Sequence, residues 1–227
     1  MKKSLITSVA ALAVGLFAFA ETGMYVKLKN GETFRHNVDD VEEVVFAEIQ
    51  EQNPIFKFTK LTNNTASVGV APGMTPAGPP ITIPSEAEID GKIYKVTHIE
   101  ALGFRDCNGL TIEIPSSVTS IGDSAFYHCQ MVRISIPSNV TSIGNGVFAG
   151  CNCLGDITIP SNVTSIGNGV FAGCYTLRDI TIPSSVTNIG DKAFAGCTGL
   201  EDITIPSSVT NIGDNAFEGC WRLEDIT

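Results

Sequence analysis

The sequence predicts a solenoid of mainly β structure, in which right-handed coils of about 23 residues stack into a rod or shallow arc. Proline, phenylalanine and cysteine recur along the second half of the chain, and neighbouring copies lie 22 or 23 positions apart. A repeat of this length is typical of folds that build one coil per repeat. The periodic residues are Pro115, Pro137, Pro160, Pro183 and Pro206; Phe104, Phe126, Phe148, Phe171, Phe194 and Phe217; and Cys107, Cys129, Cys151, Cys174, Cys197 and Cys220.

The pattern within one coil predicts which side chains face inward. Ile203 and Ile205 alternate with polar neighbours, as in a half-buried strand. Pro206 is expected to end this strand because proline lacks an N–H group. A second short strand is predicted from Val209 to Ile212, followed by a bend with positive φ at Gly213-Asp214. A single coil cannot cover its own apolar residues, so its stability must come from stacking on its neighbours.

The repeated string I-x-I-P-x-x-V-T-x-I-G-x-x-A/V-F-x-x-C-x-x-L resembles the BspA-like, treponemal-type leucine-rich repeat of bacterial surface and secreted proteins. It extends from Ile93 to Thr227 in about six coils, of which the last is incomplete. The resemblance implies a leucine-rich-repeat solenoid. It also implies a non-enzymatic role, since members of the family resemble adhesins that bind host proteins or other bacteria. It implies no particular ligand.

The first twenty residues are predicted to be a secretory signal peptide. Lys2 and Lys3 precede an apolar run from Leu5 to Phe19, which closes with the small-residue pattern Ala18-Phe19-Ala20. A permanent membrane anchor is the alternative, but the run is short for a span of about 20 residues. The mature chain is expected to begin at Glu21, to be secreted or held at the cell surface, and not to insert into a membrane.

Residues 21–53 are predicted to form a small separate module. Two apolar-rich segments, Met24–Leu28 and Glu32–His36, flank Asn30-Gly31, which is a strong signal for a β-hairpin. An acidic stretch from Asp39 to Phe46 follows. We expect it to be a solvated face, with cation binding as the alternative.

Residues 54–92 are predicted to be a β-rich cap on the first coil. Phe56–Phe58 and Ala66–Val70 alternate as strands around a turn at Asn63-Asn64. A loop rich in proline and glycine, Ala71–Pro80, then leads to Ile81–Pro84, an isolated first copy of the repeated strand. The repeats themselves are expected to occupy residues 93–227.

The last coil stops at Asp225-Ile226-Thr227 and carries no predicted cap. Its open end exposes apolar side chains and an unpaired strand edge, which is a template for association. We therefore expect either that the natural product is longer, or that a partner or a second copy covers this end by self-association.

The six periodic cysteines are expected to form one inward column of free thiols. Stacked coils bring their Cα atoms close enough for disulfides, but parallel side-chain directions favour buried thiols. Cys153 lies outside the column and is expected to be exposed or to pair. Zinc binding is not expected, because Cys151-Asn152-Cys153 lacks ligand spacing and a second pair.

No pattern in the sequence predicts catalysis, a cofactor or a dedicated metal site. The three histidines, His36, His98 and His128, lie on different segments and match no catalytic motif. Glu201 and Asp202 are adjacent, so they point to opposite faces of a strand and cannot act on one bond. The net charge of −10 and the pI near 4.7 argue against nucleic acid and anionic membrane as partners.

Columns of equivalent residues on the outer surface are the candidate binding sites. Thr158, Thr181 and Thr204 are expected to line up on the strand face, in a column that begins with Glu113 and Ser135. Flat hydroxyl ladders suit a polysaccharide or an extended peptide, although threonine is also an ordinary outward residue of strands. Tyr175 and Trp221, two coils apart, are predicted to form an aromatic contact patch.

A second column consists of aspartates, whose like charges repel by about 1 kcal/mol at strand spacing even in water. Either a bound calcium ion or the nearby arginines would relieve this repulsion. The candidate calcium ligands are Asp156, Asp179, Asp202 and Asp225, and the arginines are Arg133, Arg178 and Arg222.

These observations favour an exported, non-catalytic protein that holds an extracellular protein or glycan on its repeat surface. The alternative is a structural spacer or envelope component that displays another domain, possibly as part of a longer surface protein.

Overall fold

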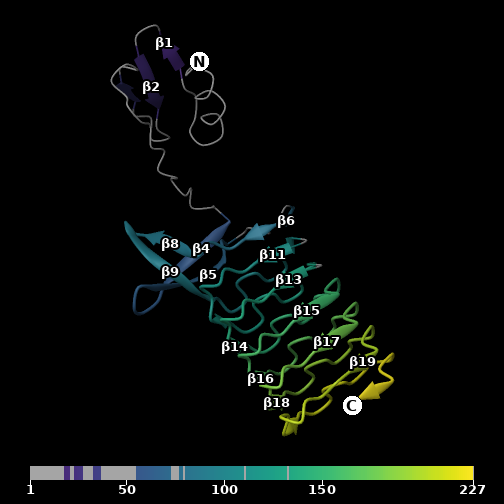
Figure 1. Cartoon of the computed structure of the whole chain (residues 1–227). Helices are drawn as coiled ribbons and strands as arrows, with labels where there is room; N and C mark the ends of the chain where they lie inside the picture. The colour runs from purple at the N-terminus through teal and green to yellow at the C-terminus, as the bar shows by residue number, and fades with distance from the viewer. Residues whose placement is uncertain are drawn as a thin grey trace, which may run out of the picture. The chain divides into compact units, whose positions relative to one another are not determined.

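The computed structural model of the chain describes residues 18–20, 23–27, 33–36, 55–72, 77–78, 80–109, 111–131 and 133–226, and the chain divides into two compact units, residues 1–50 and 51–227 (Figure 1). The first unit holds a three-stranded sheet in the order β1 (Ala18–Ala20), β2 (Gly23–Lys27) and β3 (Thr33–His36). Strands β2 and β3 pair antiparallel, as the predicted hairpin requires. The hairpin turn, the acidic stretch 39–46 and residues 1–17 of the predicted signal peptide lie outside the described residues.

The second unit begins with the predicted cap. Strands β4 (Phe56–Lys60) and β5 (Thr65–Val70) form an antiparallel hairpin, and β5 then pairs parallel with β9 (Lys92–Ile99). Strand β8 (Glu86–Ile89) folds back on β9 through a tight turn at Asp90-Gly91, where both residues have positive φ. The outermost strand of this sheet, β4, therefore runs opposite to β5 and β9.

Each coil contributes one short strand to each of two faces, and strands of successive coils pair in parallel. The labelled strands follow one another along the unit in Figure 1. The described residues include no helix, and hence no helix long and apolar enough to cross a membrane. The first sheet contains β7 (Ile81–Thr82), β11 (Thr111–Glu113), β13 (Arg133–Ser135), β15 (Asp156–Thr158) and β17 (Asp179–Thr181), and β19 (Asp202–Ile203) pairs with β21 (Asp225–Ile226) beyond them. On the second face, β12 (Ser120–Ile121) and β14 (Ser142–Ile143) continue the sheet of β4, β5 and β9, and β16 (Ser165–Ile166), β18 (Asn188–Ile189) and β20 (Asn211–Ile212) form a separate three-stranded sheet. In addition, β6 (Ala77–Gly78) pairs with β10 (Asn108–Gly109).

The core is a linear stack of identical side chains. Phenylalanine rings of successive coils lie face to face, with centroids 5.3 to 5.7 Å apart from Phe104 to Phe217. Phe56 of the cap packs edge-on against Phe104 at 6.1 Å, so the cap extends the same column. The predicted inward isoleucines of the strands, such as Ile157 and Ile180, are buried beside it. The fold is therefore the predicted solenoid.

The predicted bend at Gly213-Asp214 needs correction. Positive φ falls two residues after the glycine, at Asn215 (56°), and at the equivalent positions of other coils such as Lys192 (55°). Gly213 is required for a different reason, because a Cβ atom there would lie 2.6 Å from the carbonyl carbon of Gly190. At this column the backbones of neighbouring coils are too close for any side chain.

Polar side chains lock each coil to the one before it. The side chain of one Asx residue accepts a hydrogen bond from the backbone N–H of the equivalent residue in the next coil, for example Asn168 from Asp191 at 2.9 Å. Because the donor is always one repeat away, this ladder fixes the register between coils. The acceptors are Asp123, Asn145, Asn168 and Asp191, and the donors are Asn145, Asn168, Asp191 and Asp214.

Candidate functional site

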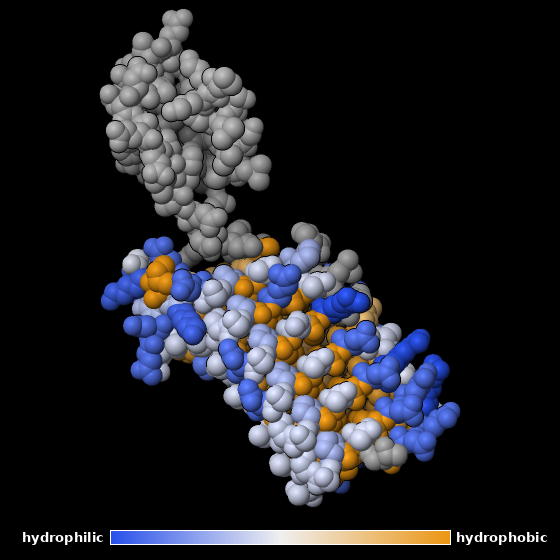
Figure 2. Space-filling view, in the orientation of Figure 1, coloured by the Kyte–Doolittle hydropathy of each residue, from blue (hydrophilic) through white to orange (hydrophobic). Residues whose placement is uncertain are grey.

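The threonine column forms with the predicted register on an open strand face. Thr158 of β15 pairs with Thr181 of β17, and Glu113 pairs with Ser135 further toward the cap. All four are exposed, and so is Thr204, which follows β19. Figure 2 shows a face of the repeat region where pale and orange residues alternate in rows, with hydrophilic blue residues gathered along its edges. The column offers regularly spaced hydroxyls, and its role in binding stays a prediction.

The aspartate column also forms, since Asp156 pairs with Asp179 and Asp202 with Asp225. Parallel pairing sets these carboxylates side by side along the solenoid instead of converging them on one point. Across the described part of the chain, no group of three or more His, Cys, Asp or Glu side chains is arranged to hold a metal ion. The calcium candidate is thus left without a coordination group.

Arg222 does not neutralise that column. Its guanidinium lies 2.5 Å from a carboxylate oxygen of Glu201, on the preceding coil. Among the described residues, the structure records no ion pair that involves the four aspartates or the other two arginines of the prediction, Arg133 and Arg178. The repulsion along the column is therefore left to solvent and dissolved ions.

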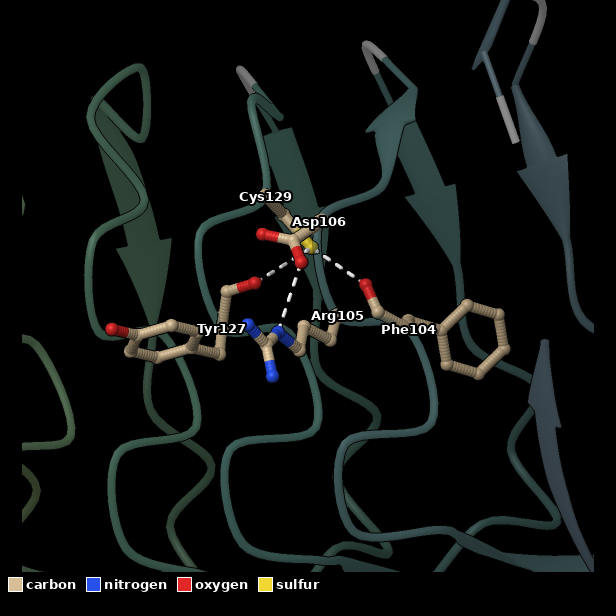
Figure 3. A network of polar contacts seen from close by, with 5 residues as sticks. All are labelled: Phe104, Arg105, Asp106, Tyr127 and Cys129. Atoms are coloured by element: carbon tan, nitrogen blue, oxygen red, sulfur yellow. Dashed lines mark hydrogen bonds and ion pairs between the residues drawn. The ribbon is translucent and has the colours of Figure 1, made fainter. Parts of the chain in front are cut away.

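The cysteine column forms hydrogen bonds between neighbouring coils. From Cys129 onward, each column thiol donates a hydrogen bond to the phenylalanine carbonyl of the preceding coil, as Cys129 does to Phe104 at 2.9 Å (Figure 3). The same geometry recurs in the later coils at 3.1 to 3.2 Å. Burial raises the pKa of Cys151 and that of Cys197 to about 12, so both thiols stay protonated at neutral pH. All seven cysteines are free, and Cys153 is exposed as expected.

Two aromatic residues stand out on the edge where each coil returns from its second strand to its first. Tyr175 is 53% exposed and Trp221 is 84% exposed. They occupy equivalent positions directly after a column cysteine, two coils apart. Both rings lie against glycine backbone, because Tyr175 atoms approach Gly173 and Gly196, and the indole nitrogen of Trp221 approaches Gly219.

The repeat pattern can now be compared with known proteins. The family model described as "BspA type Leucine rich repeat region" matches six copies, over residues 90–199 and 165–227, which is more than half of the chain. The chain belongs to the BspA-type leucine-rich repeat family. A search of curated proteins finds no match.

Solved structures of bacterial leucine-rich repeat proteins are similar to this chain. A leucine-rich cell surface protein from Faecalibacterium prausnitzii is 33% identical (TM-score 0.57), and the match covers 76% of this chain and 52% of that one. A leucine-rich repeat protein from Bacteroides ovatus is 32% identical (TM-score 0.53), with 76% and 39% covered. The T. pallidum leucine-rich repeat protein is 26% identical (TM-score 0.59), with 76% and 90% covered. The chain thus spans about half of the first relative and less of the second.

The three histidines of this leucine-rich repeat protein lie on different segments, as predicted. His98 lies in β9, where its Nδ1 is 2.8 Å from the hydroxyl of Thr97. His128 is exposed in the turn of the coil that contains Phe126, and His36 belongs to the other unit. In the described coils the serines after each proline take part in turns, as predicted.

One part of the aromatic edge was not predicted from the sequence. The rings of Tyr127 and His128 stack at 4.0 Å with an interplanar angle of 14°, and the guanidinium of Arg105 lies 5.6 Å from the centre of the Tyr127 ring. Arg105 also pairs with Asp106 at 2.9 Å (Figure 3). The signal was available in the repeat alignment, because His128 stands where later coils have Gly150 and Gly173.

Proposed function

We propose that the protein is an exported, non-catalytic binding protein that holds an extracellular protein or glycan on its repeat surface. The observation that carries the proposal is the exposed threonine column, in which β15 and β17 set Thr158 and Thr181 in register on an open face. Registered side chains along a rigid solenoid provide a pre-organised surface, which reduces the entropy lost on binding.

Family membership supports a role in interaction, and two features support a location outside the cytoplasm. The relative from Faecalibacterium prausnitzii is described as a cell surface protein. The N-terminal sequence of this chain, with Lys2-Lys3 and the run from Leu5 to Phe19, has the pattern of a secretory signal peptide. N-terminal sequencing of the secreted product tests the second point, with Glu21 as the expected first residue.

A binding screen with charge insertion on the strand face tests the proposal. The purified chain is applied to arrays of extracellular-matrix proteins and of cell-wall and plant polysaccharides. A saturable interaction should be lost in Thr181→Arg and in Thr204→Arg, because a long charged side chain stands over the column. Thr187→Arg, at an exposed position on the other side of the coil, is the matched control. Binding that survives both strand-face variants would exclude this face as the site.

The alternative proposal is a spacer or envelope component that displays another domain. A separate proposal is self-association through the last described coil. Ile212 and Ile226 are 48% and 55% exposed there, and Phe217 and Leu223 are only partly buried. Apolar side chains beside open strand edges favour contact with a second copy or with further repeats. The binding screen distinguishes the spacer from the binding protein, because a spacer should be indifferent to Thr181→Arg and Thr204→Arg, whereas a ligand bound through the strand face contradicts it. Size-exclusion chromatography with light scattering tests self-association, which a soluble monomer contradicts.

A further inference from the structure

The exposed rings on the edge of the solenoid belong to alternate coils and form a row. His128, Tyr175 and Trp221 belong to the second, fourth and sixth coils, counted from the coil that contains Phe104. Tyr175 keeps its 53% exposure although described coils flank it on both sides. Trp221 occupies the equivalent position of its own coil. The backbone positions of Tyr175 and Trp221 are therefore two strand spacings apart, about 9–10 Å. His128 stands two residues earlier in its own coil, at the position equivalent to Gly173.

The row has a flat floor of glycine backbone. Gly150, Gly173, Gly196 and Gly219 are equivalent and have φ between 72° and 74°, a conformation that side chains disfavour. Neighbouring glycines are in direct contact, since a Cβ atom on Gly196 would lie 3.7 Å from the Cα atom of Gly173. The hydroxyl oxygen of Tyr175 lies 4.0 Å from the Cβ position of Gly173, and its Cε1 lies 4.0 Å from that of Gly196. The Tyr175 ring thus reaches across two coils.

His128 is held in the row at an energetic cost. It adopts φ of 55° at the position where later coils have glycine, and a left-handed conformation is unfavourable for a residue that carries a Cβ atom. Its ring stacks on Tyr127 and also lies over Gly150, where a Cβ atom would collide with it. The stack below it extends to Arg105, so this end of the row is a supported ring and not a loose side chain.

Between the rings the surface is neutral and polar. Asn152 and Thr198 occupy the positions equivalent to Tyr175 in the neighbouring coils, and Ala172 and Ala195 lie next to the glycine floor. The charged residues at the two ends, Arg105 with Asp106 and Glu218 with Arg222, carry both signs. A neutral ligand with apolar faces and many hydroxyl groups matches this composition better than an ionic one.

We propose that the row His128, Tyr175 and Trp221 is a stacking platform for a neutral β-1,4-linked polysaccharide chain that lies along the solenoid. The C–H faces of pyranose rings are apolar and pack on aromatic faces through dispersion and hydrophobic contact. In an extended β-1,4-linked chain every second sugar presents the same face, so equivalent faces recur at the disaccharide length, which is close to two coil spacings. This inference deepens the proposed function by naming a ligand class, and it uses a different edge from the threonine column.

Affinity electrophoresis provides the test, with gels that contain xylan or hydroxyethylcellulose and pullulan gels as the α-linked control. The β-linked polymers should retard the intact chain and pullulan should not. Trp221 is the only tryptophan, so its fluorescence should change in parallel with the retardation. Tyr175→Ala and Trp221→Ala should each weaken binding about three- to tenfold, as expected for loss of one ring contact. Tyr175→Phe keeps the ring and should bind normally.

Ile93→Ala is the matched control, because Ile93 is a 59% exposed apolar residue of β9 outside the row. Circular dichroism confirms that each variant is folded. The inference is overturned if neither β-linked polymer retards the folded chain, if pullulan retards it equally, or if the Tyr175→Ala/Trp221→Ala double variant binds as the parent does. Binding that is lost in Thr181→Arg but intact in the ring variants also overturns it, while leaving the proposed function in place.

Discussion

The thiol of Cys151 donates a hydrogen bond to the carbonyl oxygen of Phe126, one coil earlier, at 3.1 Å. The same carbonyl accepts the backbone N–H of Cys129 at 3.2 Å. A carbonyl that faces the core is thus satisfied from its own coil and from the next one. Unpaired polar groups are costly in such an environment, so the cysteine column supplies donors where water is absent.

Replacing a column thiol should therefore destabilise the protein more than replacing an exposed one. We expect Cys151→Ala to lower the free energy of unfolding by about 1–3 kcal/mol, through loss of the donor and of buried volume. Cys153→Ala, only two residues away but exposed, should change it by less than about 0.5 kcal/mol. Urea denaturation of both variants measures the difference. Equal effects would contradict a structural role for the column.

Alanine substitutions should show which glycines are needed for the close approach of neighbouring coils and which are not. At Gly190 a Cβ atom would lie 2.7 Å from the backbone nitrogen of Asn168 on the preceding coil. Gly190→Ala must push two coils apart and is expected to cost more than about 2 kcal/mol. Gly155→Ala meets nothing within 4 Å and should be close to neutral. Thermal melting of the pair checks this, and a neutral Gly190→Ala would refute the close approach.

The Asx ladder predicts a specific rescue. Asn168 accepts the backbone N–H of Asp191, and its own N–H donates to Asn145. Asn168→Ala should cost about 1 kcal/mol because one N–H loses its acceptor. Asn168→Asp keeps an acceptor oxygen in the same place and should recover most of this loss. Hydrogen exchange at the Asp191 amide should be faster in the alanine variant, and similar protection in both variants would argue against the ladder.

The buried thiols also predict a loss of stability in alkali. An unfolded thiol ionises near pH 9, whereas Cys151 and Cys197 in the folded chain do so near pH 12. Below pH 9 both states hold the proton and stability is complete. Between pH 9 and about pH 12 the unfolded state releases protons that the folded state keeps, so each thiol lowers stability by up to about 1.4 kcal/mol per pH unit.

Denaturation curves at pH 8 and pH 10 measure this effect. The drop in unfolding free energy should be smaller in Cys151→Ala than in the parent chain, because one of the titrating thiols is gone. Lysine and tyrosine titrations are common to both chains and cancel in the comparison. An identical drop in the two proteins would show that Cys151 ionises normally.

The repeated landmarks predicted the fold because inward and outward residues of a stacked coil obey one simple alternation. Phe171, Cys174 and Ile180 are buried as expected, and the threonine and aspartate columns have the expected register. The prediction of positive φ at Gly213 was wrong. Glycine is needed both where φ is positive and where two backbones lie too close for a Cβ atom, and Gly213 is the second case. Sequence alone does not separate these two uses.

Other features depend on geometry that no residue pattern reveals. Coils of 22 residues omit one position after the cysteine, and Met131 then fills the buried place that Leu154 and Leu177 occupy in longer coils. The thiol-to-carbonyl bonds depend on the offset between coils. The ring of His128 joins the edge of Tyr175 and Trp221 only because the chain there is left-handed. The roles of these surfaces in binding remain predictions.

The register between coils has a consequence for the length of the molecule. The segments Ile136–Cys151 and Ile159–Cys174 have the same sequence, and each makes the same bonds to the coil before it. One whole coil can therefore be deleted or duplicated. The residues at the junction then contact the same residue types as before. The cross-section stays constant while the reach changes in steps of about 4.8 Å. Such a chain can be engineered as a molecular ruler whose span is set by the number of repeats.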